Sequence, residues 1–108
     1  MRLLRKEKPF LQAILNKADR YKRQDMLPQA NAEQINALSE MILNLLKKNI
    51  PVSSSTVKKL TRHKTLLRDL SKRRNSVKLR REQLIRQRGK GLWSGLRDTF
   101  QACLCQKR

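Results

Sequence analysis

Lysine and arginine are the residues of this 108-residue chain whose types and spacing point most clearly to a chemistry. They number 27 against 8 aspartates and glutamates, which gives a formal charge of +19 at pH 7. A chain with this charge repels itself in a compact state, and a polyanionic partner relieves that repulsion. The composition therefore favours binding to DNA, RNA, an anionic membrane surface or an acidic protein.

The positive charge is concentrated in residues 53–91. This segment contains fourteen lysines and arginines but only two acids, whereas residues 31–52 contain two of each and are neutral. Cations bind phosphates by releasing condensed counterions, without reading bases, and the planar fork of arginine also allows bidentate contacts. The candidate nucleic-acid-binding residues are Lys58, Lys59, Arg62, Lys64, Arg68, Lys72, Arg73, Arg74, Lys78, Arg80, Arg81, Arg86, Arg88 and Lys90.

Other residues that could do chemistry are few and poorly spaced for it. His63 is the only histidine, and Cys103 and Cys105 are the only cysteines, so the chain lacks the ligand spacing of a zinc site. We interpret His63 as a packed or boundary residue. Asp69 and Glu82 lie one helical turn from cations, which indicates local charge relief instead of acid–base catalysis. The sequence predicts no enzyme activity, no metal site and no cofactor.

The elements that must position the cations are predicted to be helices. Apolar residues recur at three- and four-residue spacing from Pro9 to Met26, which predicts a first helix. Asn31 and Gln34 predict a capping box at the start of a second helix, whose apolar stripe is wide enough to contact several neighbours. We expect this second helix to be central. The predicted buried face of the first helix comprises Phe10, Leu11, Ile14, Leu15, Ala18 and Tyr21.

The basic segment itself is predicted to form a third and a fourth helix. Serine hydroxyls at Ser53–Ser55 offer caps for the third helix, and a basic link from Lys72 leads to a further cap at Ser76. The fourth helix is predicted to end near Gly89. Its apolar side is thin, because Arg81 interrupts Val77, Leu84 and Ile85.

The C-terminal segment is amphipathic and follows a predicted hinge at Gly89–Gly91. Its apolar residues fall on one side of a short helix, and three arrangements remain open. The helix folds back onto the bundle, docks on a partner protein or lies in a membrane interface. The candidate partner- or membrane-binding residues are Leu92, Trp93, Leu96, Phe100 and Leu104.

The predicted fold is all-α, a small bundle of about four helices plus a short amphipathic C-terminal helix. We divide the chain into a basic N-terminal arm (1–8), a helical basic domain (9–88), and a glycine hinge with the amphipathic tail (89–108). No apolar run approaches about 18 residues, so we expect no transmembrane segment. The N-terminal residues also lack the apolar region of a signal peptide, which favours a nuclear or cytosolic location over secretion.

Four stretches of the sequence carry a resemblance to a viral family that covers about residues 10–104. Residues 31–40, 46–53, 60–70 and 87–93 are similar to small basic proteins of adintoviruses, adomaviruses and Polinton (Maverick) elements. Those proteins are compared with the X (mu) core protein precursor of adenoviruses. The resemblance implies a virion core protein that condenses or tethers double-stranded DNA, located in the virion and the host nucleus. Around 89–95 the full cleavage pattern of adenovirus-type maturation proteases is missing.

The sequence therefore leaves three candidate functions. The first is sequence-independent binding and condensation of double-stranded DNA in a virion core. The second is a regulatory RNA-binding protein that uses residues 72–88 as an arginine-rich helix. The third is an interaction protein that binds a capsid protein or a membrane through its C-terminal tail. The wide stripe of the second helix suits a homo-oligomer as well as a monomeric core.

Overall fold

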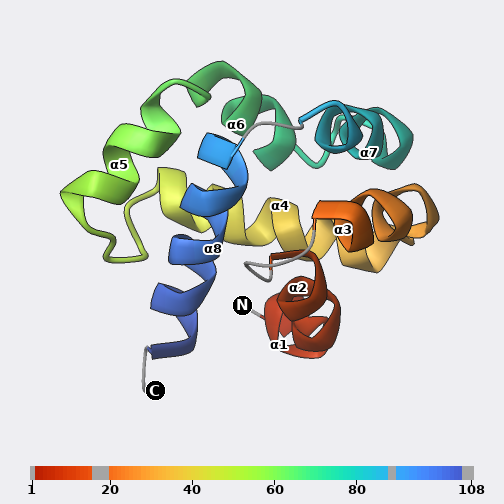
Figure 1. Ribbon diagram of the computed structural model, residues 1–108, viewed down its shortest axis with the longest axis horizontal. Coiled ribbons are helices and arrows are strands. Elements are labelled where there is room, and N and C mark those ends of the chain that lie inside the picture. The colour runs from red at the N-terminus through yellow and green to blue at the C-terminus, as the bar shows by residue number, and fades with distance from the viewer. Residues whose placement is uncertain (1, 16–19, 88–89, 106–108) are drawn as a thin grey trace.

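The computed structural model describes residues 2–15, 20–87 and 90–105. Every regular element in these ranges is a helix (Figure 1). The predicted all-α class is confirmed. The helices are shorter and more numerous than expected. They are α1 (Arg2–Lys6), α2 (Lys8–Leu15), α3 (Arg20–Met26), the 3₁₀ turn η1 (Leu27–Gln29), α4 (Ala32–Leu46), α5 (Ser54–Thr61), α6 (Lys64–Ser71), α7 (Val77–Ile85) and α8 (Lys90–Cys105).

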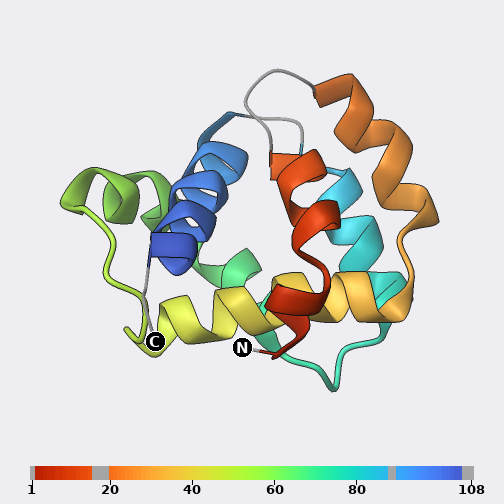
Figure 2. The ribbon, with the colours of Figure 1, turned by 90° about the horizontal axis from the view of Figure 1, so that it is seen from below.

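Helix α4 is the central helix that its wide apolar stripe predicts. It begins with the expected capping box, in which Asn31 Oδ1 accepts from the Gln34 backbone N–H and Gln34 Oε1 accepts from the Asn31 N–H, both at 2.9 Å. It contacts α1, α2, α6, α7 and α8. Figure 2 shows α4 running across the lower part of the molecule. Its fully buried apolar side chains are Ile35, Ala37, Leu38, Met41 and Ile42.

A left-handed residue ends α4 and turns the chain toward α5. Lys48 has a φ of 61°, a conformation that glycine usually occupies at this position. The Lys48 N–H donates to the Leu45 carbonyl at 3.0 Å and the Asn49 N–H donates to the Asn44 carbonyl at 2.9 Å. These two bonds form a Schellman motif, which satisfies two of the last carbonyls of α4.

The N-terminal region differs from the sequence prediction in two ways. The predicted basic arm contains α1, whose Leu3 and Leu4 are buried in the core, and α1 packs against α4. Tyr21, expected on a buried face, is 68% exposed on α3. The helix predicted from Pro9 to Met26 corresponds to α2 and α3, and residues 16–19 between them, Ala18 included, lie outside the described residues.

The third predicted helix is two helices, α5 and α6, which meet at Arg62 and His63. Ser53 caps α5 as expected, since its side chain accepts from the Thr56 N–H at 3.3 Å. His63 is half-buried at the start of α6, in a non-helical conformation, which agrees with a boundary histidine. The break lets α5 pack against α8 while α6 packs against α4 and α7.

Helix α8 is part of the core and not a separate tail. It is 16 residues long and packs against α5, α2 and α4. Gly91, predicted to belong to a hinge, lies within α8, while Gly89 lies outside the described residues. None of the described helices is long and apolar enough to cross a membrane.

Candidate nucleic-acid interface

Nine of the fourteen candidate phosphate-binding cations have exposed side chains. They lie on α5, α6, α7 and the link between α6 and α7. These helices follow one another along the upper edge of the molecule in Figure 1. We call this set the basic surface; its residues are Lys58, Arg62, Lys64, Arg68, Lys72, Arg73, Arg74, Lys78 and Arg86.

Helical spacing arranges these cations in short rows. Lys64, Arg68 and Lys72 are four residues apart along α6 and its C-cap, so they form one solvent-facing row, here called the α6 stripe. Lys58 on α5 and Arg62 at its C-cap are likewise one turn apart. A row of exposed cations is suited to phosphates, which are also regularly spaced.

Arg80 does not belong to this surface, and its assignment to phosphate binding is wrong. Its side chain is only 1% exposed. Nη1 donates to the Ser39 hydroxyl at 2.6 Å and Nε donates to the Asn75 carbonyl at 3.0 Å. Burial, together with the charge of Arg73, holds the pKa of Arg80 below its ordinary value. Arg80 is a structural residue that joins α7 to α4.

Two further candidates are engaged within the protein. Arg81 is half-buried, and its Nε and Nη2 donate to the Ala30 carbonyl at 3.1 and 2.8 Å. Lys59 Nζ lies 3.0 Å from both Asp98 Oδ2 and Ser94 Oγ. These contacts reduce the availability of both cations for a phosphate. Arg88 and the side chain of Lys90 lie outside the described residues.

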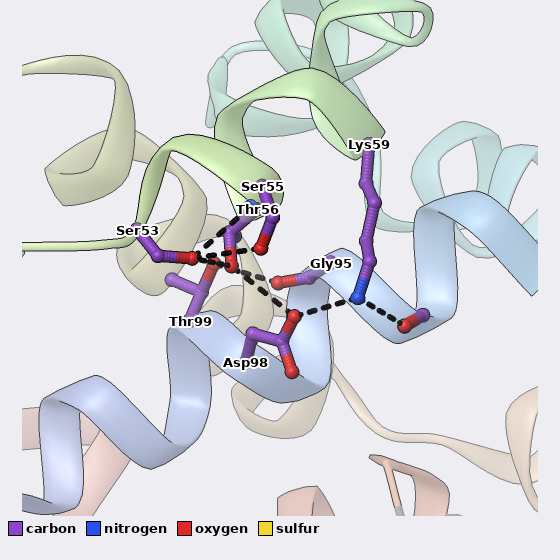
Figure 3. Close-up of polar contacts among 8 residues, drawn as sticks. Ser53, Ser55, Thr56, Lys59, Gly95, Asp98 and Thr99 are labelled. Atoms are coloured by element: carbon purple, nitrogen blue, oxygen red, sulfur yellow. Dashed lines mark hydrogen bonds and ion pairs between the residues drawn. The ribbon is translucent and has the colours of Figure 1, made fainter.

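Lys59 belongs to a polar cluster that joins α5 to α8 (Figure 3). Asp98 points from α8 toward α5, where its Oδ2 accepts from Lys59 Nζ and from Thr56 Oγ1, at 3.0 and 3.1 Å. The Thr56 hydroxyl also lies 3.1 Å from the Ser53 Oγ that caps α5. We call Ser53, Thr56, Lys59 and Asp98 the α5–α8 clip.

The clip is better suited to holding helices than to catalysis. Lys59 Nζ donates to both the Ser94 hydroxyl and the Asp98 carboxylate, so its contacts tie α5 to α8. Asp69 and Glu82 make no ion pair with the other described residues. The charge relief expected from these two acids therefore does not come from a direct ion pair among the described residues. No cluster of three metal-ligating side chains occurs in the described ranges.

Four of the five apolar residues proposed to bind a partner or membrane are buried instead. Leu92, Trp93, Leu96 and Phe100 are at most 4% exposed, and only Leu104, at 40%, is open to solvent. Trp93 Nε1 donates to the Gln87 carbonyl at 2.6 Å, and the Arg23 guanidinium lies 4.4 Å from the centroid of the indole ring. These contacts fix α8 to the bundle, the first of the three arrangements left open by the sequence.

Sequence reasoning missed the structural role of Gly95 as well as that of Arg80. A Cβ built at Gly95 would overlap the side chain of Leu60, so glycine is what allows α8 to approach α5. The pattern offered a signal for Arg80, because it falls at three- and four-residue spacing between Val77 and Leu84 on the apolar side of α7.

Comparisons of the chain with known proteins identify no relative. No protein-family model, no curated protein and no solved structure is significantly similar to the chain.

Proposed function

We propose that this protein binds the phosphate backbone of double-stranded DNA without reading its sequence and condenses it, as a non-enzymatic core protein of a virion. The observation that carries the proposal is the basic surface, nine exposed cations on α5, α6, α7, their C-caps and the link between α6 and α7. Within those helices the acids are Asp69, which is half-buried, and Glu82. A surface with so few acids attracts a polyanion along its whole length.

Among the described residues, the burial of most aromatic rings favours a duplex over a single strand. The chain extends about 30 × 28 × 27 Å, so one molecule covers about nine base pairs at 3.4 Å per pair. Single-strand binders stack bases on exposed aromatic rings. Among the described residues, Trp93 and Phe100 are buried, as is Phe10, which leaves Tyr21 on α3.

The RNA-binding alternative depends on residues 72–88 acting as an arginine-rich helix. In the fold, α7 packs against α4, α6 and η1, Arg80 is buried, and Arg81 donates to the Ala30 carbonyl. A helix held on these sides presents few arginines to an RNA groove. The geometry therefore favours contact with a phosphate backbone over entry into structured RNA.

The virion and nuclear location rests on the family resemblance, and the DNA-binding proposal stands independently of it. A titration with random-sequence duplex, single-stranded DNA and a folded RNA, each at several salt concentrations, tests the binding mode. With 6–10 phosphate contacts, duplex affinity falls about 10³–10⁵-fold between 50 and 200 mM salt. A nearly flat salt dependence, or one folded RNA outcompeting excess duplex DNA, would refute the proposal.

A further inference from the structure

An apolar groove lies between the end of α4, the segment 50–52 and the helices α5 and α6. Its volume is about 540 Å³, within the range of ligand-binding clefts. Its walls include Leu45, Leu46, Val52 and Val57. The first three are half-buried and Val57 is 51% exposed, so the groove is open to solvent along one side.

The charges at the groove are all of one sign. Lys48 and Lys64 line it, both with exposed side chains, and no acid is among its described lining residues. Lys48 is placed there by its left-handed backbone at the end of α4. The capping bond from the Thr56 N–H to Ser53 fixes the start of the opposite wall. The groove is therefore a preformed apolar surface with a cationic rim.

We propose that this groove binds an amphipathic helix of a partner protein, with apolar side chains on one face and acidic residues beside them. The apolar stripe would cover Val57 and its neighbours, and the flanking carboxylates would meet Lys48 and Lys64. Lys64 would then be taken from the α6 stripe, and the other eight cations of the basic surface would stay free for DNA. Binding of an amphipathic helix in an apolar groove is a common recognition mode. A condensing protein needs such a contact if it is to join its DNA to another protein.

Other occupants fit the groove less well. A second copy of this chain would bring the same lysines and a further charge of +19 against the rim. A nucleic-acid backbone has no apolar surface to place against the leucines. A single lipid chain would remain largely wet in a groove that is open on one side, whereas small-ligand pockets enclose most of their ligand.

A synthetic 15-residue peptide tests the proposal. It carries leucines at positions i, i+3, i+4 and i+7, with glutamates and alanines elsewhere. Methyl NMR spectra are expected to show shifts confined to the groove, at Leu45, Leu46, Val52 and Val57. A peptide of the same composition without the leucine stripe, and a version with lysine for glutamate, are both expected to bind at least tenfold more weakly.

Two matched variants separate the groove from general attraction to a cationic protein. Val57→Ser is expected to weaken binding of the glutamate peptide about tenfold, because it removes an apolar contact. Leu79→Ser, at a residue 45% exposed on α7, changes affinity less than twofold. Thermal melts of both variants confirm folding, and both retain wild-type duplex-DNA affinity because neither loses a charge. DNA binding and peptide binding can therefore fail separately.

Three outcomes would overturn the proposal. Shifts spread over the basic surface would mean non-specific charge attraction, and equal affinities of Val57→Ser and Leu79→Ser would place the peptide elsewhere. The third is displacement of the peptide by micromolar laurate, with shifts at the same methyl groups, which would assign the groove to a lipid chain.

Discussion

Arg80 donates a hydrogen bond of 2.6 Å to the hydroxyl of Ser39, and both side chains are at most 2% exposed. The contact joins α7 to the middle of α4. No carboxylate of the described residues pairs with this guanidinium. Hydrogen bonds to Ser39 and Asn75 thus stabilise a buried cation, and Arg80 differs in role from the exposed arginines around it.

Replacing Arg80 should affect folding and not DNA contact. Arg80→Ala removes two hydrogen bonds and leaves a cavity, so the free energy of unfolding should fall by about 2–4 kcal/mol. Urea denaturation measures this loss. Arg80→Met, which fills the volume, should recover part of it. The salt dependence of DNA binding by the folded fraction should not change.

Arg86→Ala is the matched control on the same helix, because Arg86 is exposed at the C-cap of α7. Its free energy of unfolding should stay within about 0.5 kcal/mol of wild type. Its salt slope should decrease by about one if Arg86 contacts a phosphate. A stable Arg80→Ala protein with a reduced slope would show that Arg80 reaches DNA after all.

The contact between Gly95 and Leu60 predicts an unusual glycine effect. Gly95→Ala should lower the free energy of unfolding by about 1–2 kcal/mol, because the new methyl group would overlap Leu60. In a Leu60→Ala background the same substitution should stabilise α8, since alanine favours helix. Gly91→Ala is the control, because its nearest contact is His63 Nε2 at 3.4 Å. Equal effects of Gly95→Ala in both backgrounds would contradict the packing described here.

Lys48 offers a stabilising substitution. Lys48→Gly should raise the free energy of unfolding by about 1 kcal/mol, because φ is 61° and glycine adopts this region without strain. Lys47→Gly removes the same charge at the preceding residue, where φ is −80°, and should not stabilise. Chemical denaturation of the pair isolates the backbone effect. A Lys48→Gly protein no more stable than Lys47→Gly would contradict it.

Burial of Cys103 predicts a loss of stability at alkaline pH. Desolvation raises the pKa of this thiol from 9.0 to about 11. Between these values the unfolded chain releases the thiol proton while the folded chain retains it, so stability is full below pH 9 and falls as the pH rises through 11. The loss amounts to about 2–3 kcal/mol.

The test of this prediction compares Cys103 with Cys103→Ala, both in a Cys105→Ser background that leaves a single thiol. All other ionisable groups are common to both proteins. The difference in their free energies of unfolding should therefore shrink between pH 9 and 11 as the thiol contribution is lost. A difference that is independent of pH would show that the thiol ionises equally in both states.

Local signals in the sequence predicted the starts of α4, α5 and α7. The caps at Asn31, Ser53 and Ser76 all form hydrogen bonds to backbone N–H groups, because a cap depends only on residues within one turn. The width of the stripe on α4 also predicted its central place. These features need no knowledge of distant parts of the chain.

Features set by tertiary packing were not predictable in the same way. The break at Arg62 and His63 lets α5 and α6 pack against different helices. The local sequence around the break does not reveal these distant packing partners. Gly95 reduces the intrinsic helicity of α8, yet the close approach to Leu60 requires it. Arg80 was assigned to the surface by residue type, although its spacing along α7 placed it on the buried side.

The exposed cations on α5–α7 and their links are proposed to bind duplex DNA through its backbone. The most direct test replaces the α6 stripe with glutamine in Lys64→Gln/Arg68→Gln/Lys72→Gln. The control is Arg2→Gln/Arg5→Gln/Lys8→Gln, which removes the same charge from exposed residues of the N-terminal helices. Salt titrations of both on random-sequence duplex should show a slope reduced by about three in the stripe variant and by less than one in the control. Equal slopes for the two variants would contradict a defined basic surface, because DNA binding would then depend only on the net charge of the protein.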